Sequence, residues 1–276
     1  MTEKPMTFTE AVAGMADRIG AEPQQEYRNP TAFDGHLRIY PTLACNLRCR
    51  YCVNEAMGCR PHRYAMAGPQ AWAKAINREG RHVVFTGGEP FLYPDLAEVI
   101  NALRPDLKVR IYTNFCLNLA DQLEWIARPV HFFISWHPQQ RADRETFLHN
   151  LVQMRSRGLF TADIHAIDAV ETAPVLAGDI AYFADHGFAI AMDSDQRGFA
   201  GAGQGLCRPA ACAKTLYLIA PDGTRYQCVS RLVRNDRPME NILAGPLGSA
   251  VAVSECPDFG NCAPCDALGE TAMAVF

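Results

Sequence analysis

Cysteine is the residue type whose number and spacing point most directly to chemistry in this chain. The 276 residues contain 11 cysteines, of which four lie between residues 45 and 59 and six between residues 207 and 265. The count is odd, and the first twenty residues hold no uninterrupted apolar segment of the kind found in signal peptides, so a disulfide framework is disfavoured. We therefore expect the cysteines to bind metal.

Three of these cysteines, Cys45, Cys49 and Cys52, form a CxxxCxxC motif directly after the first predicted strand. Three thiolates on one compact loop suit an iron–sulfur cluster better than structural zinc, which needs a fourth ligand nearby. Three ligands on a cluster of four irons leave one iron free to bind another molecule. The alternative is a zinc knuckle completed by Cys59 or His62.

The motif resembles the signature of the radical S-adenosylmethionine (SAM) superfamily, including the aromatic Tyr51 before the third cysteine. A second segment, with Gly87, Gly88 and Glu89 followed by proline, is similar to the GGEP segment of that family, whose backbone holds the amino group of the SAM methionine. Glycine suits this role because only a chain without side chains can approach a ligand so closely.

The resemblance covers roughly residues 37–195, with two further matches and one departure from the family pattern. Asn114, after Thr113, is similar to the T-N segment of the family, and Ser135 matches a serine that contacts the SAM ribose in many relatives. His137 stands where many relatives have aspartate, so it would face either SAM or the substrate. The alternative for His137 is a histidine that is simply satisfied at the end of a strand.

The resemblance implies two cofactors, SAM and a 4Fe-4S cluster, and a flavodoxin- or ferredoxin-type reductant. One electron from the cluster cleaves SAM to a 5′-deoxyadenosyl radical, which abstracts hydrogen from an unactivated C–H bond. The protein supplies orientation and a dry cavity.

Short apolar runs alternate with helical patterns from residue 36 onward, which predicts parallel βαβ units. An α/β fold follows: a partial (β/α)6 barrel over residues 36–200, with its site at the carboxyl ends of the strands. A helix is predicted at 8–19, in an N-terminal extension of residues 1–35, and helices are also expected around Leu96–Leu103, Leu119–Ile126, Leu148–Val152 and 174–186. The predicted strands are 37–43, 82–86, 108–113, 130–136, 162–168 and 188–192.

A small cysteine-rich domain is predicted over residues 201–276, with a β-hairpin of strands 215–220 and 224–230 around a Pro-Asp-Gly turn. It resembles the twitch/SPASM appendage that holds auxiliary iron–sulfur clusters after some radical SAM barrels. One auxiliary cluster, of the 4Fe-4S type, is expected. A structural zinc ribbon is the alternative. The expected ligands are Cys212, Cys228, Cys262 and Cys265, with Cys207 or Cys256 as a substitute.

The net charge of −4 and the absence of an 18-residue apolar run predict a cytoplasmic protein that binds neither nucleic acid nor membrane.

Three candidate catalytic residues are His137, Asp193 (near Asp195) and Cys207. Asp193 would bind a polar substrate or take a proton, unless it is a solvated loop carboxylate. A spare thiol near the radical, such as Cys207, could donate a hydrogen atom. For each of the spare cysteines, a small buried hydrophobe is the favoured interpretation; they are Cys59, Cys116, Cys207 and Cys256.

We expect a small polar substrate, such as a sugar, an aminocyclitol or a similar natural-product intermediate, with net oxidation or epimerisation. An enzyme that modifies a ribosomally made peptide is the alternative. A non-catalytic iron–sulfur electron carrier or a zinc-binding module is a third hypothesis, which the GGEP segment disfavours because neither needs a SAM pocket.

Overall fold

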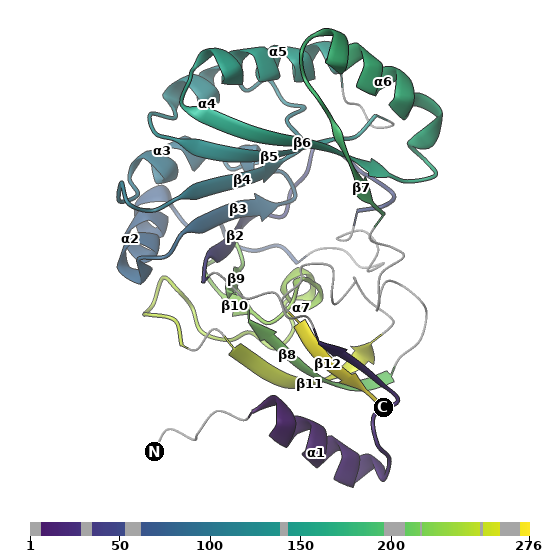
Figure 1. The fold of residues 1–276 in the computed structure, drawn as a ribbon. Helices are drawn as coiled ribbons and strands as arrows, with labels where there is room; N and C mark the ends of the chain where they lie inside the picture. Colours follow the sequence, from purple (N-terminus) through teal and green to yellow (C-terminus); the bar gives the residue numbers. More distant parts are fainter. Residues whose placement is uncertain are drawn as a thin grey trace.

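The fold consists of two β-sheets, seen in a computed structural model that describes residues 7–28, 35–52, 62–138, 143–195, 208–215, 217–248, 251–259 and 271–276. The larger sheet has eight strands in the order β10-β9-β2-β3-β4-β5-β6-β7, and the smaller has four in the order β1-β12-β8-β11. Figure 1 shows the larger sheet curving with its helices on the outer side, and the smaller sheet at the opposite end of the molecule.

All six strands predicted for the barrel are present, and each runs parallel to its neighbours. The predicted partial (β/α)6 barrel is therefore confirmed. Because the strands are parallel, their carboxyl ends meet at one edge of the sheet, which brings the segments that follow them together. These strands are β2 (Leu37–Thr42), β3 (Val83–Gly87), β4 (Val109–Thr113), β5 (Val130–Trp136), β6 (Phe160–Asp168) and β7 (Ala191–Ser194).

Helices cover the outer face of this sheet (Figure 1). Side chains along β5 alternate between the two faces of the sheet: Phe132 and Ile134 are buried toward the helices, whereas Phe133 and Ser135 are half-buried on the inner face. The apolar side chains of the outer face therefore need the helices to cover them. Sequence reasoning missed α2, whose Trp72 packs into the main core. The helices are α2 (Pro69–Glu79), α3 (Leu96–Asn101), α4 (Ala120–Trp125), α5 (Arg144–Ser156) and α6 (Ala173–Asp185), with a short 3-10 helix η1 (Pro90–Leu92).

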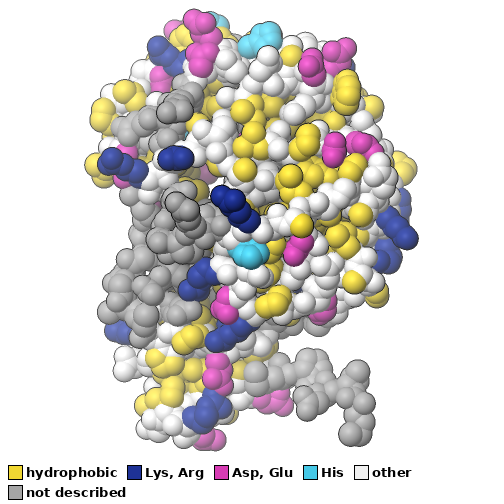
Figure 2. Space-filling model, turned by 180° about the vertical axis from the view of Figure 1, so that it is seen from behind, with side chains coloured by type: hydrophobic (Ala, Val, Ile, Leu, Met, Phe, Trp, Pro, Cys, Tyr) yellow, Lys and Arg dark blue, Asp and Glu magenta, His cyan; other side chains and the backbone are white. Residues whose placement is uncertain are grey.

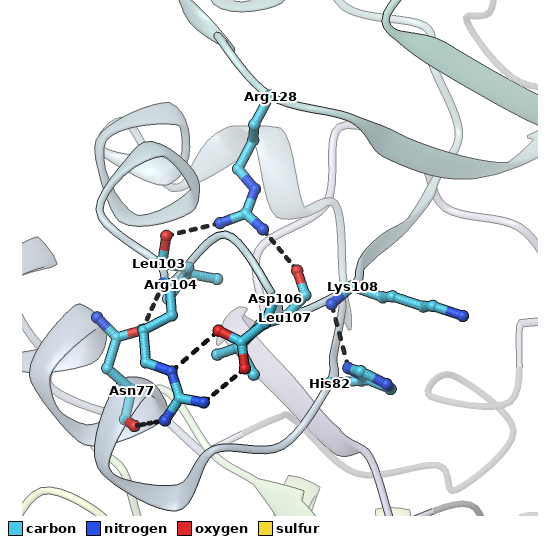
Figure 3. Close-up of polar contacts among 8 residues, drawn as sticks. All are labelled: Asn77, His82, Leu103, Arg104, Asp106, Leu107, Lys108 and Arg128. Atoms are coloured by element: carbon cyan, nitrogen blue, oxygen red, sulfur yellow. Dashed lines mark hydrogen bonds and ion pairs between the residues drawn. The ribbon is translucent and has the colours of Figure 1, made fainter.

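Side-chain hydrogen bonds fix the loops at the amino-terminal edge of the sheet (Figure 3). The Arg128 guanidinium donates to the carbonyl oxygens of Leu103, at 2.8 Å, and Leu107, at 2.5 Å. Arg104 forms two hydrogen bonds to the Asp106 carboxylate, at 3.1 and 2.5 Å. These contacts hold the α3–β4 loop against the start of β5.

The predicted hairpin exists, but it extends the barrel sheet instead of belonging to the separate small sheet. Its first strand, β9 (Tyr217–Ile219), runs parallel to β2, and its second, β10 (Arg225–Tyr226), is antiparallel to β9. The second strand is shorter than predicted because helix α7 (Val229–Arg234) begins there and buries Leu232 and Val233. The predicted domain boundary near residue 201 lies outside the described residues.

The smaller sheet joins the two ends of the chain, and its strands were not predicted. All its neighbours are antiparallel: β1 (Gln25–Arg28), β12 (Thr271–Val275), β8 (Arg208–Thr215) and β11 (Val251–Phe259). The predicted helix at 8–19 is confirmed as α1 (Phe8–Ile19), which begins with a Thr7–Glu10 capping box. Met15 of α1 packs against Ala274 and Phe276, so the N-terminal segment covers the sheet that the C-terminal residues build.

The surface carries charges of both signs. On the face shown in Figure 2, basic and acidic side chains are interspersed with apolar ones, without a large patch of one sign. Among the described residues, no helix is long and apolar enough to cross a membrane.

Candidate active site

A cavity of about 240 Å³ opens at the carboxyl-terminal edge of the barrel sheet. Residues from the segments after β2 to β6 line it, because these segments meet at that edge. Every cysteine of the CxxxCxxC motif is among them. So are five of the six residues to which the resemblance assigns SAM binding, which are Tyr51, Gly87, Gly88, Asn114 and Ser135; the sixth is Glu89. The lining consists of Cys45, Leu47, Cys49, Tyr51, Cys52, Thr86, Gly87, Gly88, Tyr112, Thr113, Asn114, Ser135, His137 and Ile167.

The three thiols lie along the loop after β2; Cys49 is buried, and Cys45 is exposed as a residue although its thiol is partly desolvated by the atoms around it. Burial raises the pKa of Cys45 to about 11 and that of Cys49 to about 12, so metal binding must displace their protons. Among the described residues, no three His, Cys, Asp or Glu side chains lie close enough to hold one metal ion. The three thiols line one cavity, as the cysteine ligands of a single iron–sulfur cluster would.

The zinc-knuckle alternative gains no support from the described residues. The ring of His62 lies 4.6 Å from that of Tyr64 and outside the cavity lining, while Cys59 lies outside the described residues.

Gly87 and Gly88 are required by the backbone that leads into the cysteine loop. A Cβ on Gly88 would lie 2.1 Å from the carbonyl oxygen of Ala44, and one on Gly87 2.4 Å from that of Thr42; the φ of Gly87 is also +132°. The sequence suggested that the glycines let a ligand approach. The structure adds a second reason, since they let β3 pack directly against the chain before Cys45.

Glu89 lies outside the cavity lining and is buried, with 1% of its surface exposed. Its carboxylate accepts hydrogen bonds from the Thr113 hydroxyl at 2.8 Å, the Asn114 N–H at 2.8 Å and the Phe91 N–H at 3.2 Å. Burial raises the pKa of Glu89 to about 7, although these hydrogen bonds act in the opposite direction. Glu89 therefore ties the end of β3 to the end of β4.

Tyr51 and His137 form a pair on the cavity wall. The Tyr51 hydroxyl lies 2.8 Å from Nδ1 of His137, and the two rings stack with centroids 5.7 Å apart. Burial lowers the pKa of His137 to about 4, so the imidazole is neutral near pH 7. A neutral imidazole offers one donor and one acceptor, which suits hydrogen bonding to a polar ligand.

Comparison with known proteins agrees with this geometry. Residues 39–151 match the model of the radical SAM superfamily. Membership of the radical SAM superfamily is thereby supported. The chain is 31% identical over 99 residues to 7-carboxy-7-deazaguanine synthase of Clostridium acetobutylicum, covering 34% of this chain and 45% of the relative. It is 33% identical over 98 residues to GTP 3′,8-cyclase of Pectobacterium atrosepticum, covering 33% of this chain and 30% of the relative.

The solved structure of anSMEcpe with bound AdoMet and the Kp18Cys peptide shares the fold. Its TM-score is 0.56 at 14% identity, covering 75% of this chain and 77% of that one. The alignments to the two curated relatives span less than half of the length of those proteins.

Asp193 lies beside this cavity, not in its lining, and it has a partner that the sequence did not reveal. Its half-exposed carboxylate is 3.3 Å from Nδ1 of His165. His165 stacks on Phe133, with ring centroids 4.7 Å apart and planes 8° apart. His165 is the β6 residue directly opposite Ser135, a pairing that only the register of the sheet reveals. The other candidate catalytic residue, Cys207, lies outside the described residues.

Three cysteines of the C-terminal part lie near one another. Cys212 on β8 is opposite Ser254 and Cys256 is opposite Ala210, so the two cysteines share a face of the smaller sheet. Burial raises the pKa of Cys212 to about 12, and the nearby Cys228 and Cys256 raise it further. The predicted ligands Cys262 and Cys265 lie outside the described residues.

Proposed function

We propose that this protein is a radical SAM enzyme that cleaves SAM reductively and uses the resulting 5′-deoxyadenosyl radical to abstract hydrogen from a small polar substrate. The observation that carries this proposal is the single cavity that gathers Cys45, Cys49 and Cys52 with Gly88 and His137. A non-catalytic electron carrier would need the cysteines alone, without the glycines and polar side chains at the ends of three further strands.

Each part of the lining has a role in this proposal. The three thiolates hold a 4Fe-4S cluster, which supplies the electron and a free iron for SAM when bound. The backbone at Gly87 and Gly88 binds the polar end of the SAM methionine, while Ser135 and His137 hydrogen-bond the rest of the molecule. The apolar walls keep water away from the reacting atoms.

The proposed substrate is small and polar, and its reaction is a net oxidation or an epimerisation. The His165–Asp193 pair supports this class because it places a half-exposed carboxylate, 3.3 Å from a histidine ring nitrogen, beside the cavity. GTP, after which the cyclases similar to this chain are named, is also a small polar molecule. A peptide-modifying enzyme is the second candidate, because the fold neighbour anSMEcpe binds a peptide.

An auxiliary 4Fe-4S cluster is proposed for the C-terminal part, with Cys212, Cys228, Cys262 and Cys265 as ligands. The nearness of Cys228 and Cys256 to Cys212 supports a thiol-rich site and strengthens Cys256 as the substitute ligand. Iron and sulfide contents near eight per chain would support two clusters. Contents near four would contradict the auxiliary cluster.

The test is 5′-deoxyadenosine formation from SAM by the anaerobically reconstituted, reduced protein. The wild type and Cys116→Ser should form it, because Cys116 lies outside the motif and the cavity lining, whereas Cys49→Ala should not. If the wild type forms none, the proposal is wrong and an electron carrier becomes the better hypothesis. Deuterium transfer into 5′-deoxyadenosine from labelled sugars, nucleotides or peptides then identifies the substrate class.

A further inference from the structure

The side-chain amide of Asn114 has a fixed orientation at the end of β4. Its Oδ1 accepts a hydrogen bond from the backbone N–H of Cys116 at 2.9 Å. A backbone N–H only donates, so this contact identifies which end of the amide is the oxygen. The NH2 group must therefore point away from Cys116, toward the cysteine loop.

Two acceptors receive the Asn114 NH2 group. Its Nδ2 lies 2.8 Å from Oδ1 of Asn46 and 3.8 Å from Sγ of Cys45. The backbone N–H of Leu47 donates to the same sulfur at 3.4 Å. A Cys45 thiolate can only accept hydrogen bonds, so both N–H groups stabilise its negative charge.

A closed ring of contacts holds this amide in place. The backbone N–H of Asn114 donates to Glu89 at 2.8 Å, and the backbone N–H of Glu89 donates to the carbonyl oxygen of Ala44 at 2.8 Å. Ala44 is bonded to Cys45, whose sulfur receives the Asn114 side chain. The ring is buried at Glu89 and Asn114, so the donor cannot turn away without leaving polar groups unsatisfied.

We propose that Asn114 is a positioning residue for Cys45, and that its amide N–H raises the reduction potential of the cluster that Cys45 binds. The inference rests on the proposed function, because it assumes a cluster at this cavity. Hydrogen bonds to ligand sulfurs stabilise the more negative, reduced state of an iron–sulfur cluster. This role replaces the contact with SAM that the sequence suggested for Asn114.

The test is a redox titration of the full-length reconstituted protein without SAM, followed by electron paramagnetic resonance (EPR). The signal to follow is the one that Cys49→Ala removes. Asn114→Ala should shift its midpoint potential to more negative values. Asn114→Asp should shift it further, since it keeps an acceptor for Cys116 but places a negative oxygen near the sulfur. The control Asn118→Ala should keep the wild-type potential, because Asn118 is exposed and its side chain accepts from the backbone N–H of Ala120.

Iron content and SAM binding complete the test. Reduced iron uptake by the Asn114 variants, with an unchanged circular dichroism spectrum, would also support a positioning role. Wild-type potential and full iron content combined with weaker binding of SAM in equilibrium dialysis would overturn the inference and restore Asn114 as a SAM ligand. A potential shift in a protein that never forms 5′-deoxyadenosine would contradict only the proposed function. A wild type without iron would overturn both.

Discussion

The two edges of the barrel sheet are built differently, although the same strands end at both. At the amino-terminal edge, Arg128 and Arg104 are bonded to loop carbonyls and to Asp106 (Figure 3). At the carboxyl-terminal edge, thiols line an open cavity and the buried carboxyl group of Glu89 has a raised pKa. The thiol-lined cavity and the buried carboxyl group thus share the edge at which barrels of this kind bind ligands.

The two edges also differ in which residues have positive φ angles. The positive φ angles at the amino-terminal edge belong to glycines, such as Gly80 at +65° and Gly158 at +65°, for which they cost little. At the carboxyl-terminal edge, Phe115 after β4 has a φ of +55°, which costs a residue with a side chain about 1 to 2 kcal/mol. Strain of this size is found where function requires a particular geometry.

The largest difference between the two edges is expected when a glycine is replaced by alanine. In Gly88→Ala the new Cβ meets the backbone of Ala44, which cannot rotate away, so we expect a loss of about 3 kcal/mol or more in unfolding free energy, and loss of iron uptake. In Gly158→Ala nothing lies within 4 Å, so the loss should be about 1 to 2 kcal/mol, from backbone strain alone, with normal iron uptake. Equal effects in urea denaturation and iron assays would contradict the comparison.

The buried Glu89 carboxyl predicts a pH dependence of stability. Its pKa is raised from 4.5 to about 7 in the folded protein, so the unfolded chain loses this proton first. The free energy of unfolding should therefore fall by about 3 kcal/mol as the pH rises from 4.5 through 7, and Glu89→Gln should remove this component. The measurement is urea denaturation of the apo-proteins across this range. Parallel pH curves for the two proteins would show that Glu89 does not titrate in this way.

Removing the Arg128 guanidinium should affect stability only. Arg128→Ala leaves the carbonyl oxygens of Leu103 and Leu107 without this donor, at an expected cost of about 1 to 2 kcal/mol in unfolding free energy. Iron content and SAM binding should stay at wild-type levels, because the residue lies at the opposite edge. A loss of SAM binding in the folded variant would show that the two edges are coupled.

The Tyr51 hydroxyl should contribute more to SAM binding than to the stability of the fold. Tyr51→Phe frees His137 from its partner, so SAM should bind about fivefold more weakly, equivalent to about 1 kcal/mol. The matched control is Tyr93→Phe, which removes a hydroxyl bonded to Ala67 outside the cavity and should leave SAM binding unchanged. Equal SAM dissociation constants for wild type and Tyr51→Phe would remove His137 from the proposed SAM site.

The smallest effect is expected at the exposed Arg104–Asp106 pair. Asp106→Asn should not change the melting temperature measurably, because water and salt screen an ion pair this exposed. A clear drop in melting temperature would show that the amino-terminal edge depends on its surface charges.

Local patterns predicted the barrel well but could not predict the smaller sheet. Apolar runs such as residues 130–136 identify buried strands, and the CxxxCxxC and GGEP motifs identify the cavity because they fall at strand ends. In the smaller sheet, β8 is rich in alanine, and β1 pairs with β12 across almost the whole chain. The hairpin was predicted, but its pairing with β2 depends on which exposed strand edge is available.

Within the site, the sequence identified the residue types but not all of their contacts. The resemblance implies that Glu89 and Asn114 bind SAM, which stays a prediction; their hydrogen bonds, which join the GGEP segment to the cysteine loop, could not be read from the sequence. His165 was missed because a single histidine in a strand carries no motif. Only the cross-strand pairing with Ser135 places it beside the cavity.

The most direct test of the central claim, that one cavity holds both the cluster and SAM, is the EPR spectrum of the reduced protein with and without SAM. We predict a 4Fe-4S signal that changes when SAM is added to the wild type and that is missing in Cys49→Ala. A signal that SAM leaves unchanged, or one that survives in Cys49→Ala with full intensity, would contradict the account.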